Sequence, residues 1–277
     1  MLLDGWTLTE IGALVAAMAA TGLAAGTLAG LLGVGGGIVI VPVLYYVFGA
    51  LGLDEEVRTH LAVGTSLATI IPTSIASARG HHGRGALDAA ILRAWGPPMV
   101  IGAAIGAAIA GLLDGEALTA IFATLGLVTA LNMAFGRESW RLGHTLPEGP
   151  GGWAIAGGNG AISAMMGIGG GVFGVTAMTL FGVPILRAIG TASAFGLLIA
   201  VPGVIGFVIT GWDADGLPPF SLGYVSLIGF ALIIPTMMAS TRLGVALAHR
   251  LDRLVLRRLF ALFLGATCLR MAWSLLG

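Results

Sequence analysis

The chain has 277 residues, of which 57% are hydrophobic and only 9% are charged, and its mean hydropathy is +1.00. Because about a quarter of the residues of a soluble domain are charged, this composition excludes a water-soluble protein and predicts one embedded in lipid. Thirteen arginines balance thirteen acidic residues and there is no lysine, which leaves no net field for nucleic acid and no Walker A lysine for ATP. The single cysteine, Cys268, excludes an internal disulfide and a multi-cysteine metal site.

Apolar stretches follow one another along the whole chain. They cover residues 10–34, 38–50, 60–79, 89–113, 116–136, 153–168, 172–183, 188–211, 220–241 and 254–276. The second, sixth and seventh are shorter than the roughly 20 residues that a spanning helix needs. Each of these three adjoins a glycine cluster, at 33–37 or at 167–171.

The pattern predicts an all-α polytopic transmembrane helix bundle with eight to ten membrane segments. We expect the two glycine clusters to break helices inside the membrane. The paired short stretches are either two short spans or one re-entrant hairpin. The hairpin is favoured, because 12 to 16 residues cover only about 18 to 24 Å of a roughly 30 Å core.

Loop charges predict the orientation, because short loops rich in arginine stay on the cytoplasmic side. The loops with Arg84, Arg137, Arg187 and Arg250 are placed inside. The N-terminus, the loop at 54–56, the turn at 114–116 and the loop at 213–215 are acidic and are placed outside, with Arg58 as an exception. Both termini are therefore predicted to be periplasmic or extracellular.

The two halves of the chain repeat each other. Residues 33–43 match 167–177 at an offset of 134, residues 63–65 match 189–191 at 126, and Pro97 and Gly106 match Pro235 and Gly244 at 138. We predict a repeat over 1–140 and a second over 150–277 within a single integral membrane domain. The loop near 84 is placed inside and its counterpart near 214 outside, so the repeats are inverted. Inverted repeats with broken helices are typical of secondary transporters that bind substrate near the midplane.

The glycine breaks are the candidate substrate site, because exposed N–H groups and the positive end of a helix dipole favour an anion. Hydroxyls on the helices that follow would add donors. The candidate residues are Gly35, Gly36, Gly37, Thr65, Ser66, Gly169, Gly170, Gly171, Thr191 and Ser193, with Asn159 a weaker candidate. For one glycine alone, close packing is the simpler interpretation. The triple glycine recurs beside short stretches in both halves, which favours a functional break. The five histidines fall in loops or at helix ends, and we expect them at the membrane interface.

The same residues resemble the sulfite exporter TauE/SafE family, the toluene sulfonate uptake permease group of bacterial membrane proteins. The resemblance lies in GLLGVGGGIVIVPVL, GTS at 64–66, the helix with Pro97 and Gly106, MMGIGGGVFGVTAM and GTAS at 190–193. It implies a secondary carrier in the bacterial inner membrane for sulfite, sulfoacetate or another organosulfonate. One departure is that Thr176 stands in the second repeat where Pro42 stands in the first.

The leading hypothesis is a secondary transporter that works by alternating access, with a small anion and membrane lipid as its partners. We expect no enzymatic activity, catalytic residue, metal, cofactor or nucleic acid, and the sequence leaves a homodimer open. A passive channel for an anion or another small solute shares the same architecture and is the alternative. A hydrolase using Ser66 and His60 is rejected, because six steps of about 100° put them on opposite faces of one helix.

Overall fold

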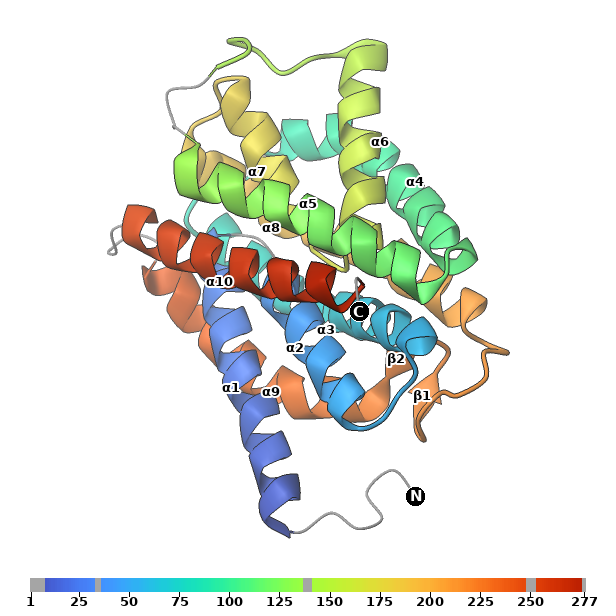
Figure 1. Ribbon diagram of the computed structural model, residues 1–277. Coiled ribbons are helices and arrows are strands. Elements are labelled where there is room, and N and C mark those ends of the chain that lie inside the picture. The colour runs from blue at the N-terminus through green and yellow to red at the C-terminus, as the bar shows by residue number, and fades with distance from the viewer. Residues whose placement is uncertain (1–7, 33–35, 137–140, 248–252, 276–277) are drawn as a thin grey trace.

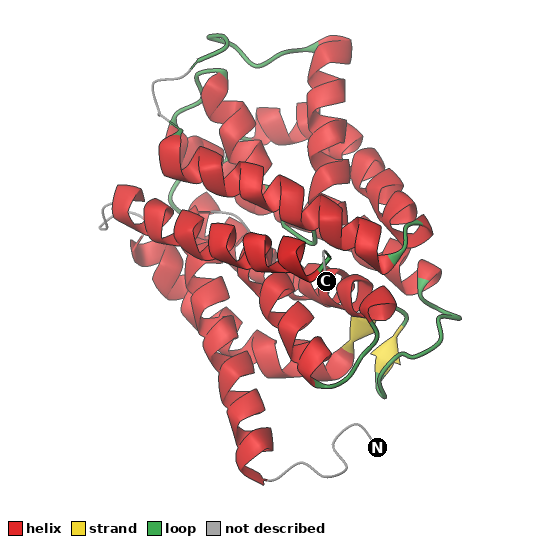
Figure 2. Ribbon diagram, in the orientation of Figure 1, coloured by secondary structure: helices red, strands yellow, loops and turns green. Residues whose placement is uncertain are grey.

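The computed structural model describes residues 8–32, 36–136, 141–247 and 253–275. The helices are α1 (Leu8–Leu32), α2 (Gly37–Ala50), α3 (Glu55–His82), α4 (Ala89–Leu112), α5 (Gly115–Phe135), α6 (Gly149–Met165), α7 (Gly171–Leu180), α8 (Ile185–Thr210), α9 (Leu227–Leu247) and α10 (Arg253–Ser274). Two short strands, β1 (Ser221–Leu222) and β2 (Val225–Ser226), pair antiparallel ahead of α9. Figure 2 shows that helices make up nearly all of the described chain.

Five of the described helices, α3, α4, α5, α8 and α9, are long and apolar enough to cross a membrane. Helices α2, α6 and α7 have 14, 17 and 10 residues, as the short apolar stretches predicted. At about 1.5 Å per residue, α7 reaches only about 15 Å and α2 about 21 Å. The composition and these helices define a polytopic helical membrane protein.

The helices pack in pairs drawn from opposite halves of the chain. Helix α1 packs along α9, α4 along α6, α5 along α10, and α3 along α8. Figure 1 shows α5 and α10 side by side across the front, with α1 and α9 below them. More of the buried hydroxyl groups lie on α3 than on any other described helix, and α3 contacts α2, α5, α8 and α9.

Glycine allows the closest of these crossings. A Cβ atom added to Gly102 of α4 would lie 1.9 Å from the carbonyl oxygen of Gly157 in α6. One added to Gly244 of α9 would lie 2.0 Å from the carbonyl oxygen of Thr27 in α1. In lipid no hydrophobic force drives helices together, and close packing at small residues stabilises their association instead.

The start of the ninth helix differs from the prediction. The apolar stretch at 220–241 contains the β1–β2 hairpin, and α9 begins only at Leu227 and continues to Leu247. Gly223 in the two-residue turn has a φ of 52°, and Phe220 before the hairpin has a φ of 60°. A helix cannot pass through two left-handed residues, so the hairpin interrupts the apolar run.

Candidate functional site

Both glycine clusters lie where a short helix begins. Gly36 has a φ of 75° and caps the N-terminus of α2, and its carbonyl oxygen accepts from the N–H groups of Val39 and Ile40 at 3.1 and 3.3 Å. In the second cluster Gly167, with a φ of 63°, turns the chain after α6, and Gly170 precedes the first residue of α7, Gly171. The predicted site residue Gly35 lies outside the described residues.

The two breaks contact each other. A Cβ atom on Gly37 would lie 2.2 Å from the carbonyl oxygen of Gly167 and 2.9 Å from Oγ of Ser66. The Ser66 hydroxyl donates to that same carbonyl oxygen at 2.7 Å. The carbonyl of the second break is therefore held between the tip of α2 and a hydroxyl of α3, both from the first half of the chain. The structure thus brings together Gly37 and Ser66, two of the predicted residues, with Gly167.

Gly170 faces a different set of partners. A Cβ atom there would lie 2.5 Å from Cδ1 of Ile199 and 3.1 Å from Cβ of Phe195, both on α8. The N–H of Gly174, one turn into α7, donates to the Gly170 carbonyl at 2.9 Å. Helix α7 is therefore seated against α8 at its first turn. Gly169 belongs to the same buried break.

Asn159 on α6 lies beside this first turn. Its side chain is 6% exposed, and its Oδ1 accepts from the Ser163 hydroxyl at 3.0 Å. Its Nδ2 has no hydrogen-bond partner within the described chain and lies 3.1 Å from where a Cβ of Gly174 would be. An amide donor with no partner in an apolar bundle is costly, because its lost hydration is not replaced. Asn159 is therefore a stronger candidate for contacting a ligand than the sequence indicated.

The three other predicted hydroxyls are engaged elsewhere. Oγ1 of Thr65 accepts from the N–H of Ser226 at 2.8 Å, and Oγ1 of Thr191 accepts from the N–H of Asp88 at 3.0 Å. The Ser193 hydroxyl donates to the carbonyl of Gly190 on its own helix at 2.6 Å. The two threonines thus fix the chain where α9 and α4 begin, rather than joining Ser66 at Gly167.

The contact between a threonine and the residues where another helix begins occurs twice, at the offsets of the sequence repeat. Thr65 and Thr191 are 126 residues apart, and their partners Asp88 and Ser226 are 138 apart. The glycine before each threonine makes a corresponding contact. A Cβ on Gly64 would meet the Tyr224 carbonyl at 2.1 Å, and one on Gly190 would meet the Ala86 carbonyl at 2.3 Å. The Gly-Thr pair that both halves share is the sequence signal for these contacts. From the sequence these threonines were expected to bind substrate, and their contacts with the segments before α4 and α9 were not predicted.

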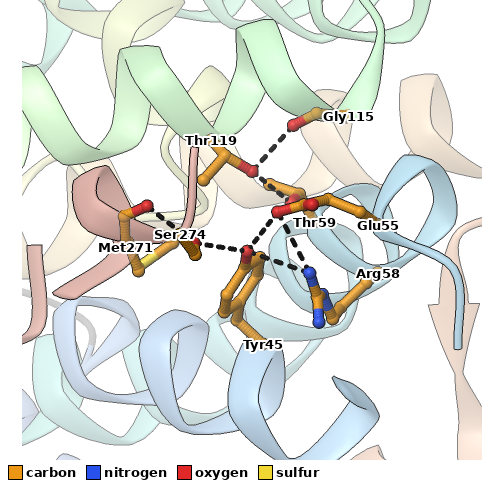
Figure 3. A network of polar contacts seen from close by, with 8 residues as sticks. All are labelled: Tyr45, Glu55, Arg58, Thr59, Gly115, Thr119, Met271 and Ser274. Atoms are coloured by element: carbon orange, nitrogen blue, oxygen red, sulfur yellow. Dashed lines mark hydrogen bonds and ion pairs between the residues drawn. The ribbon is translucent and has the colours of Figure 1, made fainter. Parts of the chain in front are cut away.

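A polar network holds the far end of α2 (Figure 3). The Tyr45 hydroxyl donates to Oε1 of Glu55 at 2.6 Å and accepts from Nη2 of Arg58 at 3.1 Å. Arg58 pairs with Glu55 at 3.0 Å, and its guanidinium lies 4.2 Å from the centre of the Tyr45 ring. The Ser274 hydroxyl of α10 lies 3.3 Å from that of Tyr45. The network links α2 to α3 and α10, and its charges compensate each other.

Substitution of Ser66 tests the contact between the breaks. Ser66 is fully buried, so in Ser66→Ala the Gly167 carbonyl would lose a donor that water cannot replace. We expect a loss of about 1–3 kcal/mol in the free energy of unfolding. Thermal unfolding in detergent measures it, with Ser193→Ala as control because Ser193 bonds only within its own helix turn. Equal losses in the two variants would contradict a special role for the Ser66 bond.

No metal-binding arrangement is evident in the described ranges, where no three His, Cys, Asp or Glu side chains gather. The polar groups of the candidate site described above are backbone groups, hydroxyls and one amide, in an apolar bundle of paired helices. Such a bundle, with several spanning helices and two broken ones, is the architecture of a polytopic membrane transport protein.

Comparison with known proteins gives the family. The profile of the sulfite exporter TauE/SafE family matches residues 18–271, so the chain belongs to this family of membrane transporters. A protein of Haemophilus influenzae is 35% identical over 254 residues, which cover 90% of this chain and 95% of that protein. One of Methanocaldococcus jannaschii is 24% identical, covering 88% and 90%, and one of Bacillus subtilis is 26% identical, covering 83% and 87%. All three carry the description "probable membrane transporter protein". No solved structure matches the chain significantly.

Proposed function

We propose that the protein is a secondary carrier that moves a small sulfur-containing anion, such as sulfite, sulfoacetate or another organosulfonate, across the bacterial inner membrane. The observation that carries the proposal is the meeting of Gly37, Ser66 and Gly167, which joins a break from each half of the chain. A carrier needs a site that both halves share, because their relative movement must expose it to each side in turn.

The chemistry of this region suits an anion. Helices α2 and α7 contain no charged residue, and their N-termini begin at Gly37 and Gly171. The first N–H groups of a helix lack partners within it and carry the positive end of its dipole. Nδ2 of Asn159 adds a donor beside α7. A sulfonate or sulfite offers several acceptor oxygens to such donors, and the family's description as sulfite exporters supports sulfur as the central atom.

The proposed mechanism is alternating access between two inverted repeats, 1–140 and 150–277. The recurrence of the Thr65–Ser226 and Thr191–Asp88 bonds at the repeat offsets supports this symmetry. In the proposed topology α2 and α7 are the ends of re-entrant hairpins that enter from opposite sides, and both termini are periplasmic. Exchange of conformations between the two halves would then convert an outward-open state into an inward-open one.

Transport by purified protein in liposomes tests this function. We expect saturable flux of at least one anion from a panel of sulfite, sulfoacetate and aromatic sulfonates. Internal unlabelled substrate should accelerate uptake of the labelled one, because a carrier returns loaded. Protein-free liposomes are the control. A linear flux without counterflow would indicate a passive channel, and no flux of any panel member would refute the anion proposal.

A further inference from the structure

The two glycine breaks present different groups to a ligand. At the start of α2, a Cβ atom on Gly37 would lie 2.2 Å from the carbonyl oxygen of Gly167, so an acceptor oxygen lies at this helix tip. The Ser66 hydroxyl beside it has one proton to donate, and it donates that proton to the same oxygen. An acceptor oxygen repels an anion. The tip of α2 is therefore a poor anion site, although its sequence matches that of the second break.

The first turn of α7 has donors that lack acceptors. Helix α7 has ten residues, and the N–H groups of Val172 and Phe173 in its first turn make no hydrogen bond within the described chain. The side chain of Asn159 on α6 lies beside this turn and is 6% exposed, and its Nδ2 has no partner among the described residues. This tip therefore offers an anion a buried side-chain donor together with backbone N–H groups.

The amide of Asn159 is held with its nitrogen toward α7. The Ser163 hydroxyl, one turn later on α6, donates to Oδ1 at 3.0 Å. Nδ2 lies 3.1 Å from the position that a Cβ of Gly174 would occupy, and Cδ2 of Phe195 lies 3.1 Å from the same position. A separation of this size is a hydrogen-bond distance. Because Gly174 has no side chain, α7 itself does not fill the place where an acceptor would meet the amide nitrogen.

The helices around Asn159 carry little positive charge. Helix α6 packs along α4 and contacts α7 and α8, and the only charged residues of these four helices are Arg93 and Arg187. Arg93 is exposed, and its Nε donates to the carbonyl of Ala89 at 3.2 Å. Arg187 is also exposed and lies 3.7 Å from the carboxylate of Asp88. The donors at the first turn of α7 are therefore neutral groups.

Neutral donors in apolar surroundings select an anion by its charge. Met99, Phe195 and Ile199 are fully buried, and each lies within 4 Å of where a Cβ of Gly170 would be. The free energy needed to move an ion from water into such surroundings rises with the square of its charge. The attraction of an amide and of one helix N-terminus, with about half an elementary charge, rises only in proportion to the charge. One negative charge is therefore bound more readily than two.

We infer that the anion binds at the first turn of α7, with Asn159 as its side-chain donor, and that this site selects singly charged sulfur oxyanions such as a monosulfonate or hydrogensulfite. The inference rests on the proposed function and narrows its substrate class. Nδ2 of Asn159 and the N–H groups of α7 donate to the oxygens on sulfur. The contact of Gly167 with Gly37 connects the bound anion to the first half of the chain. Doubly charged anions, including sulfoacetate and sulfate, bind weakly.

Replacement of Asn159 separates binding from folding. In Asn159→Leu the donor is lost at similar side-chain volume, and no amide nitrogen remains buried without a partner. We expect its unfolding temperature in detergent without ligand to equal or exceed that of the unmodified protein, whereas loss of a purely structural amide would lower it. Its affinity for methanesulfonate, measured from the rise of the unfolding temperature with ligand concentration, should be roughly tenfold to a hundredfold weaker.

Two glycine variants complete this test. Gly158→Ala is the matched control, because it changes the neighbouring residue of α6 and a Cβ there would meet nothing within 4 Å. Gly174→Ala places a methyl group 3.1 Å from Nδ2 of Asn159, where an oxygen of the anion would lie, and should also weaken methanesulfonate binding. Affinity equal to that of Gly158→Ala in Asn159→Leu, or in Gly174→Ala if the leucine variant does not fold, would overturn the assignment of Asn159.

Transport tests the charge selection and separates this inference from the proposed function. Methanesulfonate carries one negative charge and methanedisulfonate carries two on the same carbon skeleton. In liposomes at equal ionic strength, we expect counterflow with internal methanesulfonate and loss of most of it with methanedisulfonate. Counterflow with methanedisulfonate or sulfoacetate as fast as with methanesulfonate would overturn the charge selection and leave the carrier standing. Absence of counterflow with any sulfur anion in the unmodified protein would refute the proposed function and this inference together.

Discussion

Gly37→Ala is expected to abolish or severely reduce transport while the protein still inserts into the membrane. The new Cβ would lie 2.2 Å from the carbonyl oxygen of Gly167, a backbone atom that cannot rotate away. The two breaks must then separate, which removes their shared site. Overpacking of this kind costs about 1–3 kcal/mol, which corresponds to a loss of roughly fivefold to more than a hundredfold in the competent arrangement.

The measurement is initial flux of the transported anion into liposomes at matched protein density, together with thermal unfolding of the same sample. Gly265→Ala is the control, because a Cβ there would meet only Cβ of Ala130, at an ordinary 3.7 Å. Flux in Gly37→Ala equal to that of Gly265→Ala would show that contact between the breaks is not required for transport.

Gly160→Ala is expected to destabilise the fold strongly. Gly160 of α6 faces α4, and a Cβ there would lie 2.2 Å from the Met99 carbonyl oxygen and 3.0 Å from the Ala103 nitrogen. Both are backbone atoms of α4, which cannot rotate away as a side chain can, so the two helices must move apart where they cross. We expect a loss of about 3 kcal/mol in the free energy of unfolding, at the upper end for overpacked cores.

Gly158 supplies a control two residues away on the same helix. A Cβ on Gly158 would meet nothing within 4 Å, so Gly158→Ala should be neutral or slightly stabilising. Both variants gain the same helix propensity, so a difference in their thermal unfolding in the same detergent reports the packing of the added Cβ. Equal unfolding temperatures would contradict the close approach of α4 and α6.

The helices of the fold could be predicted closely from the sequence, since lipid demands an apolar surface and loops concentrate the charge. The stretch at 89–113 became α4 over Ala89–Leu112 because Asp88 caps its start and Asp114 begins the next element. The hairpin at 221–226 was not predicted, because Leu222 and Val225 make it look like the start of the apolar run that continues into α9. The left-handed turn at Gly223 is a property of the backbone that hydropathy does not report.

The two glycine breaks could be predicted from the sequence, but their contacts could not. The repeated glycines indicated two breaks, and the structure places Gly37 against Gly167. Thr65 and Thr191 were expected to supply donors beside them, yet each accepts an N–H from a residue more than 100 positions away. His60 was expected at the interface because it lies near a helix end, and its side chain is only 2% exposed. Its burial depends on α4 and the hairpin, whose approach no local pattern reveals.

The proposed alternating-access mechanism requires the two halves of the chain to have opposite orientations in the membrane. Single cysteines at Gly83 and Asp215 test this in a Cys268→Ala background, because Gly83 and Asp215 are exposed in corresponding loops of the two halves while Cys268 is buried. A membrane-impermeant thiol reagent should label Asp215→Cys in intact cells and Gly83→Cys only after the membrane is opened. Labelling of both cysteines from the same side would contradict inverted repeats and, with them, the proposed exchange between two facing glycine breaks.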